Sequence, residues 1–255
     1  MPLSKPLPGS LWRPRGGIPQ PVGAWLLNDG GAQARDSSGN RNHGTLTNMD
    51  PATDWVGTPY GGGLNFDGSN DRIALPDIPG LATPGTVIFG GMIPGALAQF
   101  AVSRNGLGGN NGWGFGVNSS NQPYWFAGGQ GTFSWETLTV PTGVPIWMGY
   151  TYPNSPNRTV TVRGPGYAAT ETKSASYWGN AGGMLHHIGA YNVTYWSGDL
   201  YAVLMWDVAL TVAALADVLD NPFAGWRPST QCWYAAAGGA EQAAANMVRS
   251  VMVIG

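Results

Sequence analysis

The sequence has few charged side chains and a single cysteine. Charged residues make up 10% of the 255 residues, and the formal net charge is −2, whereas ordinary soluble domains carry roughly 25% charged residues. The chain therefore lacks the clustered positive charge with which proteins bind nucleic acids, and we expect no nucleic-acid partner. The one cysteine, Cys232, excludes an intrachain disulfide and a zinc site built from several thiolates.

Long apolar runs are also missing. No stretch approaches the roughly 20 apolar residues of a transmembrane helix, so we expect no membrane span. The N-terminal segment has no apolar stretch of the kind found in secretion signals and is interrupted repeatedly by proline. Because proline restricts the backbone and removes an N–H donor, residues 1–20 are predicted to form an extended arm.

What the sequence does contain is typical of an all-β protein. Apolar residues make up 43% of the chain and aromatic residues 11%. Short β-branched and aromatic runs alternate with Gly, Asn, Asp and Pro, a pattern that favours a sandwich of antiparallel strands. One short helix is predicted at residues 211–219, with Thr211 as its N-cap. Strands are predicted at residues 22–27, 63–66, 72–75, 86–93, 99–103, 114–118, 123–126, 132–135, 146–152, 159–163, 185–189 and 198–206.

Two segments resemble a known family. Residues 22–76 contain GAWLLNDGG, DSSGNRNHGTL and GGGLNFDGSNDRIALP, and residues 198–227 read GDLYAVLMWDVALTVAALADVLDNPFAGWR. Together they resemble the laminin G-like, concanavalin A-like domains. The resemblance implies a jelly-roll sandwich of two antiparallel sheets at residues 21–228, followed by a C-terminal tail at residues 229–255. Members of the family bind sugars, bind proteins or serve as structural modules.

The proline-rich leader ahead of such a domain also resembles bacteriophage structural proteins. The main functional hypothesis is therefore a non-enzymatic virion protein, such as a capsid decoration or fibre-like protein, assembled in the host cytoplasm. Its partners would be virion or capsid proteins and further copies of itself, since a composition rich in aromatics and poor in Lys and Glu is typical of interfaces. The alternative is a lectin-like module that recognises cell-surface glycans, and a hydrolase is a third hypothesis.

Four aromatic residues on short, glycine-flanked strands are the best candidates for a glycan platform, because aromatic faces stack on sugar rings. Most other rings are expected to fill the core of the sandwich. The candidate platform residues are Trp113, Tyr124, Trp125 and Trp135.

Five oxygen-bearing side chains on turns form a candidate calcium site: Asp36, Asn40, Asp67, Asn70 and Asp71. Carboxylate and amide oxygens suit calcium, and the family resemblance implies that these turns pack near each other. The same residue types also shape turns without any metal. Calcium is thus a possible cofactor, and a pair of hydrogen-bonded turns is the alternative.

Catalytic patterns are weak. Concanavalin A-like glycosidases place acids two residues apart on one strand, and no Glu-x-Asp-x-Glu pattern occurs here. We therefore expect no enzymatic activity and no catalytic residues. His186 and His187 are adjacent on a predicted strand, so their side chains should point to opposite faces and not share one metal ion. His43, in a turn, is predicted to be structural.

Overall fold

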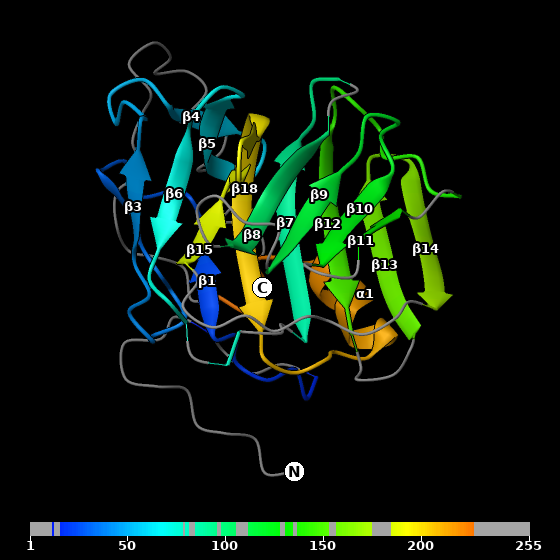
Figure 1. The fold of residues 1–255 in the computed structure, drawn as a ribbon. Helices are drawn as coiled ribbons and strands as arrows, with labels where there is room; N and C mark the ends of the chain where they lie inside the picture. Colours follow the sequence, from blue (N-terminus) through cyan, green and yellow to red (C-terminus); the bar gives the residue numbers. More distant parts are fainter. Residues whose placement is uncertain are drawn as a thin grey trace.

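Two antiparallel sheets pack face to face in the computed structural model, with one short helix outside them (Figure 1). The structure describes residues 12, 16–78, 80–81, 85–95, 98–105, 112–127, 131–134, 137–152, 157–174 and 185–226. The predicted jelly-roll sandwich is confirmed.

The first sheet is eight-stranded and is centred on the longest strand. Its order is β14-β13-β12-β7-β18-β5-β4, and β1 also pairs with β18. Its strands are β1 (Gly23–Trp25), β4 (Trp55–Thr58), β5 (Gly61–Asp67), β7 (Thr86–Met92), β12 (Pro145–Thr151), β13 (Asn157–Gly164), β14 (Tyr167–Ser174) and β18 (Ser197–Trp206).

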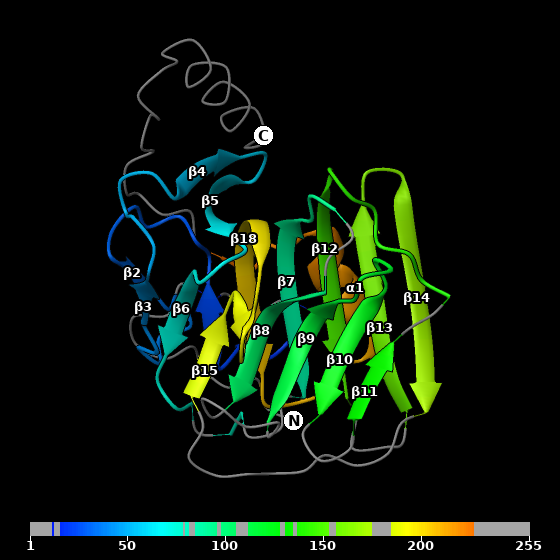
Figure 2. The ribbon, with the colours of Figure 1, turned by 45° about the horizontal axis from the view of Figure 1, so that its top comes forward.

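The second sheet, also eight-stranded, covers the first (Figure 2). Its order is β11-β10-β9-β8-β15-β6-β3-β2. A small hairpin of β16 (Ala190–Tyr191) and β17 (Thr194–Tyr195) lies against β8, where the Ser103 hydroxyl donates to the Ala190 carbonyl. The sheet's strands are β2 (Gln33–Ala34), β3 (Gly44–Thr47), β6 (Arg72–Leu75), β8 (Gln99–Asn105), β9 (Trp113–Val117), β10 (Pro123–Ala127), β11 (Gly131–Ser134) and β15 (Leu185–Ile188).

Every predicted strand overlaps an observed one, and the helix is where it was expected. Helix α1 (Val212–Asp220) begins after Thr211, whose Oγ1 accepts a hydrogen bond from the Ala214 N–H at 3.2 Å. The sequence did not indicate β2, β3, β4, β14, β16 or β17. These are short or carry small and polar residues: β14 reads YAATETKS and pairs only with β13 at the edge of its sheet.

The core between the sheets follows from the two-residue period of strands. Along β7, Val87 and Phe89 point toward the second sheet and are fully buried. Ile88 points the other way, into the apolar cluster on the outer face of the first sheet. The Phe89 ring contacts Phe115 of the second sheet at 5.5 Å between centroids and Trp196 at 5.4 Å. Aromatic edge-to-face contacts therefore join the two layers.

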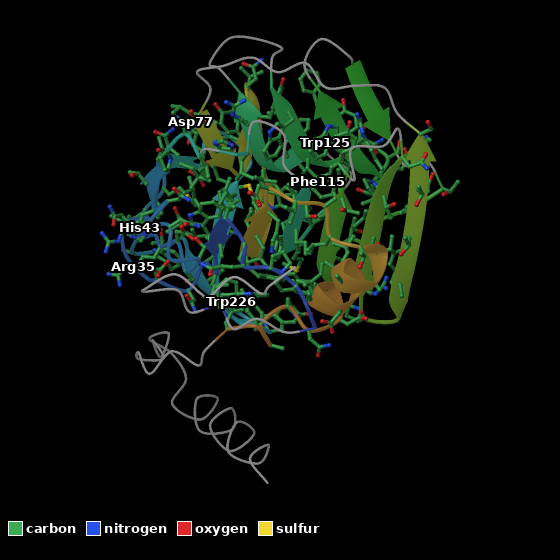
Figure 3. The ribbon with its side chains drawn as sticks, turned by 90° about the horizontal axis from the view of Figure 1, so that it is seen from below. Arg35, His43, Asp77, Phe115, Trp125 and Trp226 are labelled. Atoms are coloured by element: carbon green, nitrogen blue, oxygen red, sulfur yellow. The ribbon has the colours of Figure 1, made fainter. Side chains whose placement is uncertain are left out.

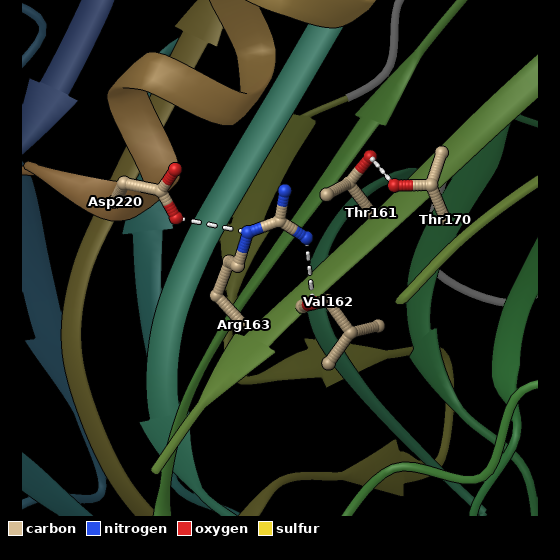
Figure 4. Close-up of polar contacts among 5 residues, drawn as sticks. All are labelled: Thr161, Val162, Arg163, Thr170 and Asp220. Carbon is tan, nitrogen blue, oxygen red and sulfur yellow. Dashed lines mark hydrogen bonds and ion pairs between the residues drawn. The ribbon is translucent and has the colours of Figure 1, made fainter. Parts of the chain in front are cut away.

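Helix α1 covers the outer face of the first sheet. Gly149 on β12 leaves room for the helix, because a Cβ there would lie 2.5 Å from Leu215 Cδ1. At the end of the helix, Arg163 Nε donates to Asp220 Oδ1 at 2.9 Å, and beside it the Thr161 and Thr170 hydroxyls are 3.1 Å apart (Figure 4). None of the described residues forms a helix long and apolar enough to cross a membrane.

The N-terminal segment extends this outer layer. Trp12 is 1% exposed and packs edge-on against Trp226, at 5.0 Å, and Trp206, at 6.2 Å. Ile18 is also buried, and Trp206 Nε1 donates to the Pro19 carbonyl at 2.8 Å. Trp12 and Ile18, within the predicted N-terminal arm at residues 1–20, are therefore packed against the sandwich. The predicted tail at residues 229–255 lies outside the described residues.

Replacing Trp12 by alanine should lower the free energy of unfolding by about 3–5 kcal/mol, because the change leaves a cavity between Trp206 and Trp226. Urea denaturation followed by circular dichroism measures the change. The matched control is Val193→Ala, since Val193 is 79% exposed and should shift the free energy by no more than about 0.5 kcal/mol. Equal stability of Trp12→Ala and wild type would contradict the docking of this segment.

Candidate functional site

Two of the predicted platform residues belong to the core. Trp113 on β9 and Trp125 on β10 are 1% and 0% exposed. Trp125 stacks on Tyr150 of the first sheet, with 4.0 Å between ring centroids, and Figure 3 shows it beside Phe115 in the interior. The prediction that Trp113 and Trp125 form an exposed platform is therefore wrong, because strand alternation turns both rings inward.

Tyr124 lies on the opposite face from Trp125, as its neighbouring position on β10 requires. It is half-buried on the outer face of the second sheet. The last predicted platform residue, Trp135, lies outside the described residues.

Tyr124 belongs instead to a different group of rings, which we call the outer aromatic cluster: Phe100, Tyr124, Phe126 and Tyr191. The Phe100 ring contacts Tyr124 at 5.5 Å and Tyr191 at 4.9 Å between centroids, and Phe126 contacts Tyr191 at 4.8 Å. Gly114 beneath them makes this packing possible, because a Cβ there would lie 2.7 Å from the Phe100 ring and 3.1 Å from Tyr191.

Hydroxyl and amide groups accompany the rings. The Tyr191 hydroxyl is buried and has no hydrogen-bond partner in the part of the chain that the structure describes. Burial raises its pKa to about 12, and the nearby Tyr124 adds to this effect. In the turn between β9 and β10, Asn118 Nδ2 donates to Gln122 Oε1 at 2.9 Å. The site therefore combines apolar ring surface with groups that can donate and accept hydrogen bonds.

Sequence reasoning could have found part of this cluster. Phe126 is two residues from Tyr124 on the same strand, so the two-residue period already places both rings on one face. Phe100 and Tyr191 come from distant parts of the chain, and only the pairing of β8 with β9 and the fold of the β16–β17 hairpin bring them there.

In the first of the predicted calcium turns, the carboxylate oxygens of Asp36 are engaged by hydrogen bonds from nearby residues. Asp36 Oδ1 accepts hydrogen bonds from the N–H groups of Ala24 at 3.0 Å and Ser38 at 2.8 Å. Its Oδ2 accepts from the Ser38 hydroxyl at 2.8 Å and the Asn42 N–H at 2.9 Å. Asn40 donates to a backbone carbonyl at 2.9 Å. These oxygens serve the turn itself.

The second turn is arranged in the same way. Asp67 Oδ1 accepts from the Ser69 N–H at 2.7 Å, which lowers the pKa of Asp67. Asp71 Oδ2 accepts from the Asp67 N–H at 2.9 Å, whereas burial raises the pKa of Asp71. The Asn70 carbonyl accepts from Asn48 Nδ2 at 3.1 Å.

The fold keeps the two turns apart. The Asp36 N–H donates to Nδ1 of His43, which lies just before β3, at 3.0 Å. Asn70 instead accepts from Asn48, which lies just after β3. The four residues of β3 span about 13 Å. Within the part of the chain that the structure describes, no three His, Cys, Asp or Glu side chains are placed to hold a metal ion. The prediction of one five-residue calcium site is therefore wrong.

His186 and His187 point to opposite faces of β15, as predicted. His186 is fully buried, packs edge-on against Trp113 at 6.0 Å, and faces the interior. His187 points to the outer face of the second sheet and is 5% exposed. Both side chains are therefore buried on opposite faces of β15, and His43 holds the Asp36 turn.

Comparisons with known proteins identify similar folds and no family. No family model and no curated protein sequence matches the chain. Among solved structures, domain 4 of AbnA, a GH43 extracellular arabinanase from Geobacillus stearothermophilus in complex with arabinotriose, is similar with a TM-score of 0.54 and 15% identity, over 78% of this chain and 98% of that domain.

Sialidase from Trypanosoma rangeli is similar as well. Its complex with the inhibitor DANA gives a TM-score of 0.56 at 12% identity, over 81% of this chain and 33% of the sialidase. Its complex with sialic acid gives a TM-score of 0.55 at 13% identity, over 83% of this chain and 36% of the sialidase. The chain thus spans about a third of the sialidase. These likenesses establish a β-sandwich fold shared with domains of carbohydrate-active proteins.

Asp36→Ala should lower the free energy of unfolding by about 3 kcal/mol, because it leaves buried N–H groups without acceptors. Thermal and urea denaturation should give the same loss with calcium or with a chelator present. The control is Asp207→Ala, whose carboxylate is exposed. A loss of stability in wild type on chelation alone would show that a metal holds this turn.

The protein should lose stability between pH 6.5 and pH 4. Burial lowers the pKa of His186 and of His187 from 6.5 to about 4. The folded state therefore binds fewer protons than the unfolded chain, and stability that is complete above pH 6.5 is lost as the pH falls through 4. The loss should be on the order of 3 kcal/mol per histidine, measured by urea denaturation across this range.

The control for this pH dependence is His186→Phe, which removes one of the two titrating groups and keeps a ring in the core. The variant should have a shallower dependence than wild type. An unfolding free energy of wild type that does not change between pH 7 and pH 4 would contradict the burial of neutral histidines.

Proposed function

We propose that the protein is a carbohydrate-binding module that holds a saccharide against the outer aromatic cluster. The observation that carries this proposal is the pair of rings on β10: Tyr124 and Phe126 lie on one face, both half-buried, on the side of the sheet away from the core. Ligand sites combine apolar and aromatic surface with a few placed polar groups. Sugar rings, with an apolar face and a rim of hydroxyls, match that combination.

The polar groups of the cluster fit the hydroxyl rim of a sugar. Among the residues that the structure describes, the Tyr191 hydroxyl has no hydrogen-bond partner, and an unpaired buried hydroxyl is costly. A sugar hydroxyl that reached it through a small shift of the neighbouring rings would remove this cost. The Tyr124 hydroxyl, on a half-buried ring of the same cluster, provides a further donor and acceptor.

The similar structures support a binding role. The arabinanase domain, which this chain covers almost completely, is in complex with arabinotriose, and the sialidase is in complex with sialic acid. A shared fold alone does not assign a ligand, so the proposal rests on the outer aromatic cluster. The virion role that the sequence favoured first has no counterpart among these structures.

We also propose that binding occurs without cleavage. Most glycosidases use two carboxyl groups that are free to act on the glycosidic bond. The neighbouring carboxylates Asp67 and Asp71 are both engaged by backbone N–H groups of their turn. The β9 and β10 strands that carry the proposed site contain no acidic residue.

Tyr124→Ala and Phe126→Ala should each weaken glycan binding at least tenfold, or about 1.4 kcal/mol, because each removes stacking surface. A glycan array identifies the ligand, and isothermal titration calorimetry with that ligand measures the affinity. The array should include arabino-oligosaccharides and sialylated glycans.

The matched control is Tyr60→Ala, since Tyr60 is 38% exposed and packs on Trp147 of the first sheet. It should bind the glycan like wild type. Loss of affinity in Tyr60→Ala with none in the two β10 variants would move the site to the first sheet. An array without any bound glycan would refute the function, and release of reducing sugar from the bound ligand would refute binding without cleavage.

A further inference from the structure

Among the described residues, Arg72 on β6 has no partner for its charge. It is half-buried on the outer face of the second sheet, because its neighbour Ile73 points into the core. Its Nε is buried and forms no hydrogen bond, and no ion pair involves it within the described residues. The preceding carboxylate, Asp71, accepts from the Asp67 N–H instead. A partly buried guanidinium without an acceptor is unfavourable.

A second unpaired nitrogen lies beside it. His187 pairs with Ala74 on β6, two residues from Arg72 on the same face. The side chain is 5% exposed, and its Nδ1 is buried without a hydrogen-bond partner. Arg72 is close enough to lower the pKa of His187, in addition to the larger effect of burial. Two nitrogen-bearing side chains with unused hydrogen-bonding atoms therefore share one surface.

The surroundings of this pair favour an anion. Strands β3, β6 and β15 contain no acidic residue. Thr47 lies directly opposite Arg72 in the register, and Ser103 lies opposite His187. A planar guanidinium binds carboxylate, phosphate or sulfate through two parallel hydrogen bonds.

We propose that Arg72 and His187 bind an oxyanion, and that this oxyanion is the carboxylate of an acidic sugar held on the same face as the outer aromatic cluster. The second part rests on the proposed glycan binding. His187 is separated from Gly114, beneath Tyr191, by two strand steps through β8, or about 10 Å. A short oligosaccharide can therefore contact the rings and Arg72 together.

The test compares acidic and neutral ligands on three Arg72 and His187 variants. Arg72→Gln should weaken binding of a sialylated or uronic-acid oligosaccharide at least tenfold in calorimetry and leave neutral saccharide binding within twofold of wild type. Arg72→Lys should recover part of the affinity, because it keeps the charge and loses the planar geometry. His187→Gln should weaken acidic ligands by less than Arg72→Gln.

The matched control is Arg163→Gln, which removes the same charge from the first sheet, where Arg163 pairs with Asp220. It should bind acidic ligands like wild type. An equal loss in Arg163→Gln, or no loss in Arg72→Gln, would overturn the oxyanion site. Inorganic sulfate and phosphate are titrated separately by NMR. Saturable binding of these ions that requires Arg72, without binding of any acidic sugar, would overturn the sugar assignment.

These outcomes separate the two proposals. Suppose that Tyr124→Ala loses neutral saccharide binding and that no Arg72 variant weakens the binding of acidic ligands. This outcome would retain the glycan-binding function and refute the oxyanion site. Sulfate binding that depends on Arg72 in a protein that binds no glycan would retain the oxyanion site and refute the glycan-binding function.

Discussion

The stack of Trp125 on Tyr150 joins the two sheets, and the arrangement of the second sheet depends on it. With 4.0 Å between the ring centroids and no exposure of either ring, the contact fixes which face of β10 is turned inward. Because strand side chains alternate, Tyr124 and Phe126 must then lie on the outer face. The proposed binding surface is thus a consequence of how the core is packed.

The outer faces of the two sheets differ in their covering. Helix α1 and the segment with Trp12 and Ile18 cover much of the first sheet and form a second apolar layer there. On the second sheet, the described covering is the β16–β17 hairpin, which rests on β8 and places Tyr191 over Gly114. The half-buried rings of Tyr124 and Phe126 and the unpaired Arg72 lie on this second face, which is why both proposals concern it.

Because the chain has few charged residues, each unpaired charge stands out as a candidate binding group. The described ion pairs are few: Arg163 with Asp220, and Arg104 with Asp77 at 3.7 Å. Many of the acidic side chains bind backbone N–H groups in turns, as Asp36 and Asp67 do. Aspartates that looked like metal ligands in the sequence therefore serve as turn acceptors, and an arginine without an acid partner becomes informative.

The sequence by itself determined the fold class, most strands and the capped helix, because strand alternation, turn residues and N-caps act over a few neighbouring residues. It also determined that His186 and His187 face opposite ways. It did not indicate β14, an edge strand in which Tyr167 is the one large apolar residue. Only the tertiary structure decided which aromatic face is buried, that Trp12 packs on Trp226, and that the Asp36 and Asp67 turns lie apart. Those outcomes depend on pairing between distant segments, which local sequence patterns do not encode.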